Sequence, residues 1–152
     1  MSPVSTYTNI RYIRHLKSEN KYDAIEELTR TFEGDNICDD IDALVGALKE
    51  REEIMSTGIG FGIAIPHEKI SPVREMAFAI GISSRGIDFD SMDGAPVYLV
   101  ILVAAGEKQH KKYLKLLSGI MAILKNEATK EKIIRSTPEE IITILHREEV
   151  VE

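Results

Sequence analysis

The sequence predicts an α/β domain with a central β-sheet flanked by helices, and three observations support this fold class. Segments with strand-like and helix-like periodicity alternate at short spacing along the whole chain. The run at residues 97–104 is continuously apolar, which is typical of a strand buried on both faces in the middle of a sheet. The 152 residues, 43% of them hydrophobic, are enough for one domain with a core. Since no linker or repeat divides the chain, we expect a single domain over residues 1–152.

The first third of the chain predicts one strand and two helices. Ile10, Ile13 and their neighbours predict a strand over residues 9–16. A helix is expected over residues 20–33, with Asn20 as its N-cap, followed by a second helix over residues 40–54. The expected inward positions are Ala24, Ile25, Leu28 and Phe32 in the first helix, and Ile41, Leu44, Val45 and Leu48 in the second.

The remainder predicts three strands and two further helices. One strand ends at Ile65, and the others cover residues 76–83 and 97–104. A helix is expected over residues 108–125, and a capping box with Pro at the first helical position opens a last helix that ends near His146. The expected inward stripe of the first of these helices is Leu114, Leu117, Ile120, Met121 and Leu124.

Charge and composition exclude several classes of protein. The formal charge of −6 argues against nucleic acid as the main ligand. No apolar run is long enough to span a membrane, and the N-terminal residues lack the apolar core of a signal peptide. Cys38 is the only cysteine, so no intrachain disulfide can form. We therefore expect a cytoplasmic protein that takes part in any membrane process as a separate polypeptide chain.

The most informative segment is the Gly-rich run at residues 56–67, where a short apolar strand stops at Pro66 and a single histidine, His67, follows. A histidine that carries a phosphoryl group must be partly neutral near pH 7, and its ordinary pKa allows this. Backbone N–H groups in Gly-containing turns can bind the anionic group, and nearby hydroxyls can add donors. The candidate phosphoryl-binding residues are Ser56, Thr57, Gly58 and Gly60.

Arg51 is the candidate cation for this site. Leu44 and Leu48 lie on the inward stripe of the second helix, and helical spacing continues that stripe to Arg51. A guanidinium at this helix end could bind a phosphoryl oxygen in a bidentate manner.

The run from residue 51 to 67 resembles the signature of the EIIA domain of the bacterial phosphoenolpyruvate-dependent phosphotransferase system, in its fructose/mannitol branch. That branch includes the nitrogen-regulatory EIIA proteins, and its pattern is Arg-Glu, Ser-Thr-Gly and Gly-x-Gly-x-Ala-Ile-Pro-His. Residues 21–28, 86–97 and 113–124 are also similar to segments of the family. The resemblance therefore covers nearly the entire chain.

The resemblance implies a mixed sheet with helices on both faces. It implies that His67 accepts a phosphoryl group at Nε2 from the phosphocarrier protein HPr or its nitrogen-branch relative, and that Arg51 supports the site. It further implies onward transfer to a cysteine of an EIIB domain, or regulation of other proteins by the phosphorylation state of His67.

One position departs from the family pattern. Where members usually carry a second histidine in the third helix, this chain has Tyr113, with His110 nearly one turn earlier. His110 could substitute, Tyr113 could donate its hydroxyl to the phosphoryl group, or onward transfer could be impaired.

Two functions remain open from the sequence. One is a phosphocarrier enzyme with HPr and EIIB as separate chains, so that any link to a membrane is indirect; the other is a regulatory module switched by phosphorylation of His67. A metal-dependent hydrolase is disfavoured because the four histidines show no zinc-ligand spacing. A nucleotide-binding enzyme is disfavoured because the glycines do not form GxGxxG. We expect neither a metal nor a cofactor.

Overall fold

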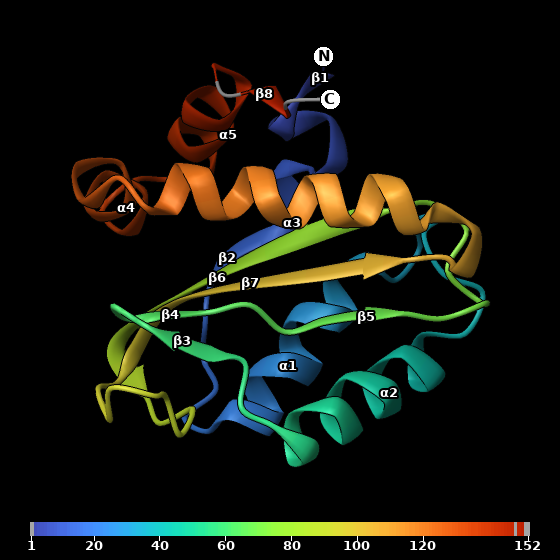
Figure 1. Cartoon of the computed structure of the whole chain (residues 1–152), viewed down its shortest axis with the longest axis horizontal. Coiled ribbons are helices and arrows are strands. Elements are labelled where there is room, and N and C mark those ends of the chain that lie inside the picture. The colour runs from blue at the N-terminus through green and yellow to red at the C-terminus, as the bar shows by residue number, and fades with distance from the viewer. Residues whose placement is uncertain (1, 148, 151–152) are drawn as a thin grey trace.

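A computed structural model describes residues 2–147 and 149–150, and it shows one domain built from three layers (Figure 1). A central mixed sheet lies between α1 and α2 on one face and the C-terminal helices on the other (Figure 1). The α/β fold class and the helices on both faces are therefore confirmed.

The elements have the following bounds. The strands are β1 (Ser2–Pro3), β2 (Ile13–His15), β3 (Gly58–Gly60), β4 (Ile63–Ala64), β5 (His67–Lys69), β6 (Ala77–Ile87), β7 (Val97–Ala105) and β8 (Glu149–Val150). The α-helices are α1 (Lys21–Thr29), α2 (Ile41–Ile54), α3 (His110–Leu124), α4 (Glu127–Ile134) and α5 (Pro138–His146). Short 3-10 helices are η1 (Val4–Tyr7), η2 (Ile10–Tyr12), η3 (Arg30–Phe32) and η4 (Glu107–Gln109). The short strands β1 and β8 pair with each other near the two ends of the chain (Figure 1).

The main sheet has the order β2-β6-β7-β4-β3, and β5 also pairs with β7. β7 is antiparallel to β6 and parallel to β4 and β5, so the sheet is mixed. β4 and β5 follow the same register along β7, because Ile63 lies opposite Leu99 and His67 lies opposite Val103.

The line formed by β4 and β5 is interrupted at Ile65 and Pro66. The Ile65 N–H donates to the carbonyl of Thr57 (3.0 Å), which continues the antiparallel pairing of β3 with β4 on the side away from β7. Pro66 has no N–H, but its carbonyl accepts from the N–H of Val103 (2.9 Å). This interruption places His67 at the start of β5 while keeping it attached to the central strand.

Side chains alternate between the two faces of the sheet, as expected for strands. The face under α3 and α5 is lined by large residues, and the face under α1 and α2 by many alanines, which let these helices pack close to the strands. The first set includes Ile63, Ile65, Phe78, Ile80, Ile82, Leu99, Ile101 and Val103; the second includes Ala64, Ala77, Ala79, Val100, Leu102 and Ala104.

Most helix starts follow the expected capping chemistry. The side chain of Asn20 accepts from the N–H of Asp23, and Thr137 forms a capping box with Glu140 ahead of Pro138. The sequence prediction missed α4, which begins after Asn126; the side chain of Asn126 accepts from the N–H of Thr129.

Two element predictions need correction. The strand predicted over residues 9–16 is limited to β2, because the Asn9 side chain accepts from the N–H of Arg11 and stabilises the turn η2 in its place. In α3, Leu114 and Met121 are exposed rather than inward. The buried residues of α3 are Tyr113, Leu116, Ile120, Ile123 and Leu124. None of the helices within the described ranges combines the length and apolar character needed to cross a membrane.

Candidate functional site

His67 is half-buried at the start of β5, and its ring is held by the backbone two residues earlier. Its Nδ1 atom lies 2.6 Å from the carbonyl oxygen of Ile65. A carbonyl can only accept a hydrogen bond, so Nδ1 carries the proton and Nε2 of the neutral ring keeps its lone pair. The local backbone therefore favours the tautomer in which Nε2 carries the free lone pair.

The imidazole faces a cavity of about 220 Å³. Four of the residues singled out from the sequence line it together, although they come from α2, the loop after it and β5. The lining consists of Arg51, Ser56, Thr57, Ile59, Ile65, His67, Leu117 and Met121. The apolar members come from the sheet and from α3, and they leave His67 and Arg51 as the ionisable groups of this lining.

Arg51 lies in the last turn of α2, where its guanidinium donates from Nη1 to the carbonyl of Met55 (2.7 Å). This bond satisfies one of the carbonyls that a helix end leaves without a partner. A guanidinium has five N–H donors in a planar fork, so the bond leaves capacity for an anion beside His67.

The hydroxyls of Ser56 and Thr57 are already used within the protein. Ser56 donates to the carbonyl of Phe89 and accepts from the N–H of Gly58 (3.0 Å). Thr57 donates to Glu52 Oε1 (2.5 Å). The geometry therefore does not support the expectation that these hydroxyls donate to a phosphoryl group; they order the wall of the cavity.

Two of the glycines serve packing and turn geometry. A Cβ at Gly58 would lie 2.3 Å from Ser91 Oγ, so no larger residue fits there without movement. Gly60 has φ +92° in the turn between β3 and β4. Within the described chain, neither glycine is among the residues that line the His67 cavity.

Hydrogen bonds hold both backbone groups of Phe61, in the turn between β3 and β4. The N–H of Phe61 donates to Asp93 Oδ2 (3.0 Å), and its carbonyl accepts from the Lys130 ammonium (2.8 Å). Phe61 has φ +58° and an exposed side chain, and it lies on the rim of an adjoining apolar groove.

Tyr113 occupies the position next to His67, with the ring centroids 6.1 Å apart. Burial, and then the carboxylate of Glu68, raise the pKa of Tyr113, while Arg51 lowers it to a smaller extent. The phenol therefore keeps its proton near pH 7 and can donate. His110 is exposed at the start of α3, and its Nδ1 lies 2.7 Å from the Lys69 ammonium. Of the two candidates for the second position, Tyr113 is the one packed against His67.

Glu52 was missed by the sequence interpretation, although it follows Arg51 directly in the motif. Its side chain is buried, and its carboxylate accepts from both the N–H and the hydroxyl of Thr57. Buried carboxylates are rare unless several donors satisfy them. The sequence signal that could have identified Glu52 was an acidic residue directly beside a candidate site residue.

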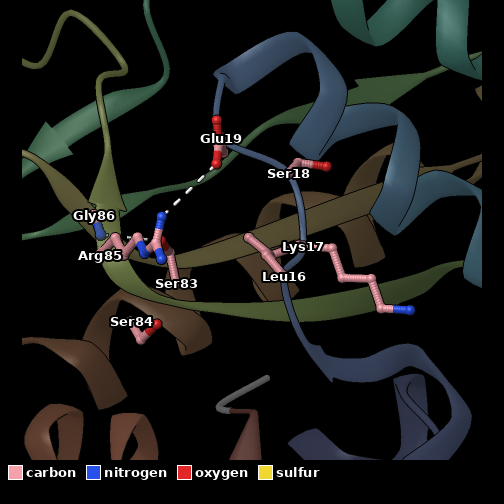
Figure 2. A pocket seen from close by; sticks show the side chains of 8 residues that line it. All are labelled: Leu16, Lys17, Ser18, Glu19, Ser83, Ser84, Arg85 and Gly86. Carbon is pink, nitrogen blue, oxygen red and sulfur yellow. Dashed lines mark hydrogen bonds and ion pairs between the residues drawn. The ribbon is translucent and has the colours of Figure 1, made fainter.

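A second cavity of about 450 Å³ lies between the segment before α1 and the end of β6 (Figure 2). Arg85 at its edge pairs with Glu19 (3.9 Å), and the Ser83 hydroxyl accepts from the N–H of Gly86 (3.0 Å). None of the residues predicted for the phosphoryl site lines it, so this cavity is separate from His67. Among residues 2–147 and 149–150, no group of three or more His, Cys, Asp or Glu side chains could hold a metal ion.

The family model described as "Phosphoenolpyruvate-dependent sugar phosphotransferase system, EIIA 2" matches residues 6–148. The chain belongs to this EIIA family. The resemblance stated from the sequence is confirmed, and the match includes every predicted site residue of this EIIA chain.

Relatives of this EIIA chain include sugar-specific and regulatory proteins. The fructose-specific EIIA component of Haloferax volcanii is 38% identical over 107 residues, which are 68% of each protein. The fructose-specific EIIABC component of Bacillus subtilis is 34% identical over 84% of this chain, but the match spans only 20% of that longer protein. The crystal structure of the nitrogen regulatory protein IIA-Ntr from Neisseria meningitidis superposes with a TM-score of 0.87 at 25% identity, covering 95% of this chain and 99% of the other.

Proposed function

We propose that this EIIA domain, residues 1–152, is a phosphocarrier of the phosphotransferase system. It accepts a phosphoryl group on His67 from an HPr-like phosphocarrier protein, or its nitrogen-branch relative, and passes it to a cysteine of an EIIB domain. The observation that carries the proposal is the hydrogen bond from His67 Nδ1 to the Ile65 carbonyl, which leaves Nε2 as the free nitrogen beside Arg51.

The chemistry at His67 needs no proton transfer. The Nε2 lone pair forms a bond to phosphorus while the bond from phosphorus to the donor's ring nitrogen breaks and returns its electron pair to that nitrogen. The proton stays on Nδ1, and its hydrogen bond to the Ile65 carbonyl stabilises the positive charge that develops on the ring. In the onward step a cysteine thiolate attacks phosphorus, and Nε2 regains its electron pair.

The main requirement is to stabilise the negative charge on the transferred phosphoryl group. Transition states of phosphoryl transfer need positioning and electrostatic stabilisation more than covalent chemistry. Arg51 supplies the cation, and the Tyr113 hydroxyl supplies a neutral donor; the position of the Tyr113 ring beside His67 supports this role. No cofactor takes part. We assign the protein to the cytoplasm, where HPr-like partners act, with any contact to a membrane transporter made through EIIB.

The test is incubation with phosphoenolpyruvate, the first enzyme of the system and HPr, followed by detection of an acid-labile, base-stable label. We expect wild type to be labelled and His67→Ala to remain unlabelled. His15→Ala, an exposed histidine of β2, is the matched control and should be labelled like wild type. A label that survives in His67→Ala would refute the assignment of the site.

A regulatory role is the second candidate, in which phosphorylation of His67 changes which proteins bind. The likeness to the nitrogen regulatory protein and the replacement of the second histidine by Tyr113 favour it. Labelled protein mixed with candidate EIIB domains separates the two roles. Rapid loss of the label to a cysteine supports the carrier, whereas retention supports the regulator.

A further inference from the structure

We propose that Glu52 is a positioning residue that fixes the tautomer of His67 through Thr57 and Ile65. The proposal rests on the proposed phosphocarrier function, because the tautomer decides whether Nε2 can attack phosphorus. It assigns a role to the acidic half of the Arg-Glu pair, which does not itself line the cavity but is hydrogen-bonded to Thr57, which does.

Glu52 is only 2% exposed, and donors from two residues, Thr57 and Lys21, satisfy its carboxylate. Its Oε2 accepts from the N–H of Thr57 (3.0 Å), and its Oε1 accepts from the Thr57 hydroxyl (2.5 Å). The Lys21 ammonium, from α1, lies 3.4 Å from Oε2 and also pairs with Asp90 (3.0 Å). Burial of a carboxylate is unfavourable unless donors satisfy it, and this set of donors holds the Glu52 carboxylate in one geometry.

The two bonds from Thr57 fix both the backbone and the rotamer of that residue. The carbonyl of Thr57 in turn accepts from the N–H of Ile65 (3.0 Å), at the point where the strand line beside β7 is interrupted. The carbonyl of Ile65 then accepts from Nδ1 of His67 (2.6 Å). Glu52 is thus connected to the imidazole by an unbroken series of hydrogen bonds.

The N–H of Ile65 faces away from β7 and donates to Thr57, so Thr57 is the partner that holds this peptide on the β3 side. If Thr57 shifts, the peptide of Ile65 loses its anchor and its carbonyl can turn away from the imidazole. The ring is then free to adopt the other tautomer, in which the proton on Nε2 blocks attack on phosphorus. The carboxylate of Glu52 therefore acts on reactivity without contacting the reacting atoms.

The test is Glu52→Gln, which keeps the size of the side chain but replaces one acceptor oxygen by an NH₂ donor facing Thr57. Glu53→Gln, on the neighbouring exposed residue, is the matched control. Nitrogen NMR of the histidine rings should show the Nδ1–H tautomer for His67 in wild type and Glu53→Gln, and a mixture in Glu52→Gln. The initial rate of labelling by phospho-HPr should fall roughly 10-fold in Glu52→Gln alone, which is the lower end of the range found for partners that orient metal-binding histidines.

Thr57→Val is the second variant, and it decides the matter if Glu52→Gln does not fold. It removes the hydroxyl bond but keeps the N–H bond to Glu52, so we expect a smaller shift of the tautomer in the same direction. A pure Nδ1–H tautomer in every variant that folds would overturn the proposal, even if labelling were slowed. The NMR measurement does not depend on phosphorylation, so failure of wild type to be labelled would refute the proposed function alone.

Discussion

The phenol ring of Tyr113 lies beside the imidazole of His67, with the ring planes tilted by 47° and the centroids 6.1 Å apart. Tyr113 comes from α3 and His67 from β5, so this contact joins the C-terminal helix layer to the sheet at the candidate site. Burial raises the pKa of Tyr113, so its hydroxyl remains a neutral donor near pH 7.

We predict that Tyr113→Phe slows phosphoryl acceptance by His67. A hydrogen bond to a charged group contributes about 1.5–3 kcal/mol, so loss of a hydroxyl that binds the phosphoryl group should lower the labelling rate at least about 10-fold. Initial labelling rates with limiting phospho-HPr measure this effect. Tyr98→Phe, on the exposed side of β7, is the control. Equal rates in Tyr113→Phe and wild type would show that the ring serves packing only.

We predict that Arg51→Ala slows labelling more strongly, by roughly 2–4 kcal/mol of transition-state stabilisation. Arg51→Lys should recover only part of the rate, because an ammonium keeps the charge but loses the planar fork that binds two oxygens at once. Arg85→Ala is the control, since Arg85 lies at the separate cavity of Figure 2. Labelling of Arg51→Ala at the wild-type rate would remove this residue from the site.

We predict that the protein loses stability at alkaline pH because the Tyr12 hydroxyl deprotonates. Burial, and then the hydrogen bond to Asp35, raise the pKa of Tyr12 to about 12, whereas an unfolded chain has a tyrosine pKa of about 10. The folded state therefore holds this proton more tightly. The resulting stabilisation is complete below about pH 10 and is lost as the pH rises through about 12.

Urea unfolding from about pH 9 to pH 12 tests this linkage. Tyr12→Phe removes the titrating hydroxyl, so its free energy of unfolding should fall less steeply with pH than that of wild type. Tyr22→Phe, in the first turn of α1, is the control. Curves of equal slope for Tyr12→Phe and wild type would contradict the raised pKa.

Two glycines should respond to alanine in opposite directions. Gly46 lies on the exposed side of α2, with nothing within 4 Å of an added Cβ, so Gly46→Ala should stabilise the protein by about 0.5–1 kcal/mol. An added Cβ at Gly58 would lie 2.3 Å from Ser91 Oγ and 3.2 Å from its Cα, so Gly58→Ala should destabilise by about 1–3 kcal/mol. The difference between the midpoints of chemical unfolding measures both effects, and a stabilising Gly58→Ala would contradict the packing described for β3.

The sequence was a good guide to several helix starts, and four of the residues that it singled out line one cavity. Asn20, Asp40 and Thr137 cap their helices as local chemistry predicts, because capping depends only on residues within one turn. His67 and Arg51 could be predicted as candidates because the motif places His67 at the end of a strand and Arg51 at the end of a helix. The hydrogen bonds from Glu52 to Thr57 could not be predicted from periodicity.

Which face of α3 is buried was harder to predict from the sequence. Residues 113–124 are apolar on most of the helix surface, so two stripes one residue apart fit the helical period equally well. The buried stripe contains Tyr113 and Leu116, while Leu117 and Met121 line the cavity at His67. The glycines of β3 raised a similar ambiguity, because positive φ and close packing need glycine as much as an anion-binding turn does.

The alternation of side chains along the strand line beside β7 makes the site sensitive to chain length. Ile63, Ile65 and His67 share the face covered by α3, because each is two residues from the next. One amino acid inserted between Ala64 and His67 would turn the imidazole toward α1 and α2, where Arg51 and Tyr113 could not both reach it. Substitutions in this segment alter the surroundings of the imidazole, but a change of one residue in its length would move the imidazole to the opposite side of the sheet.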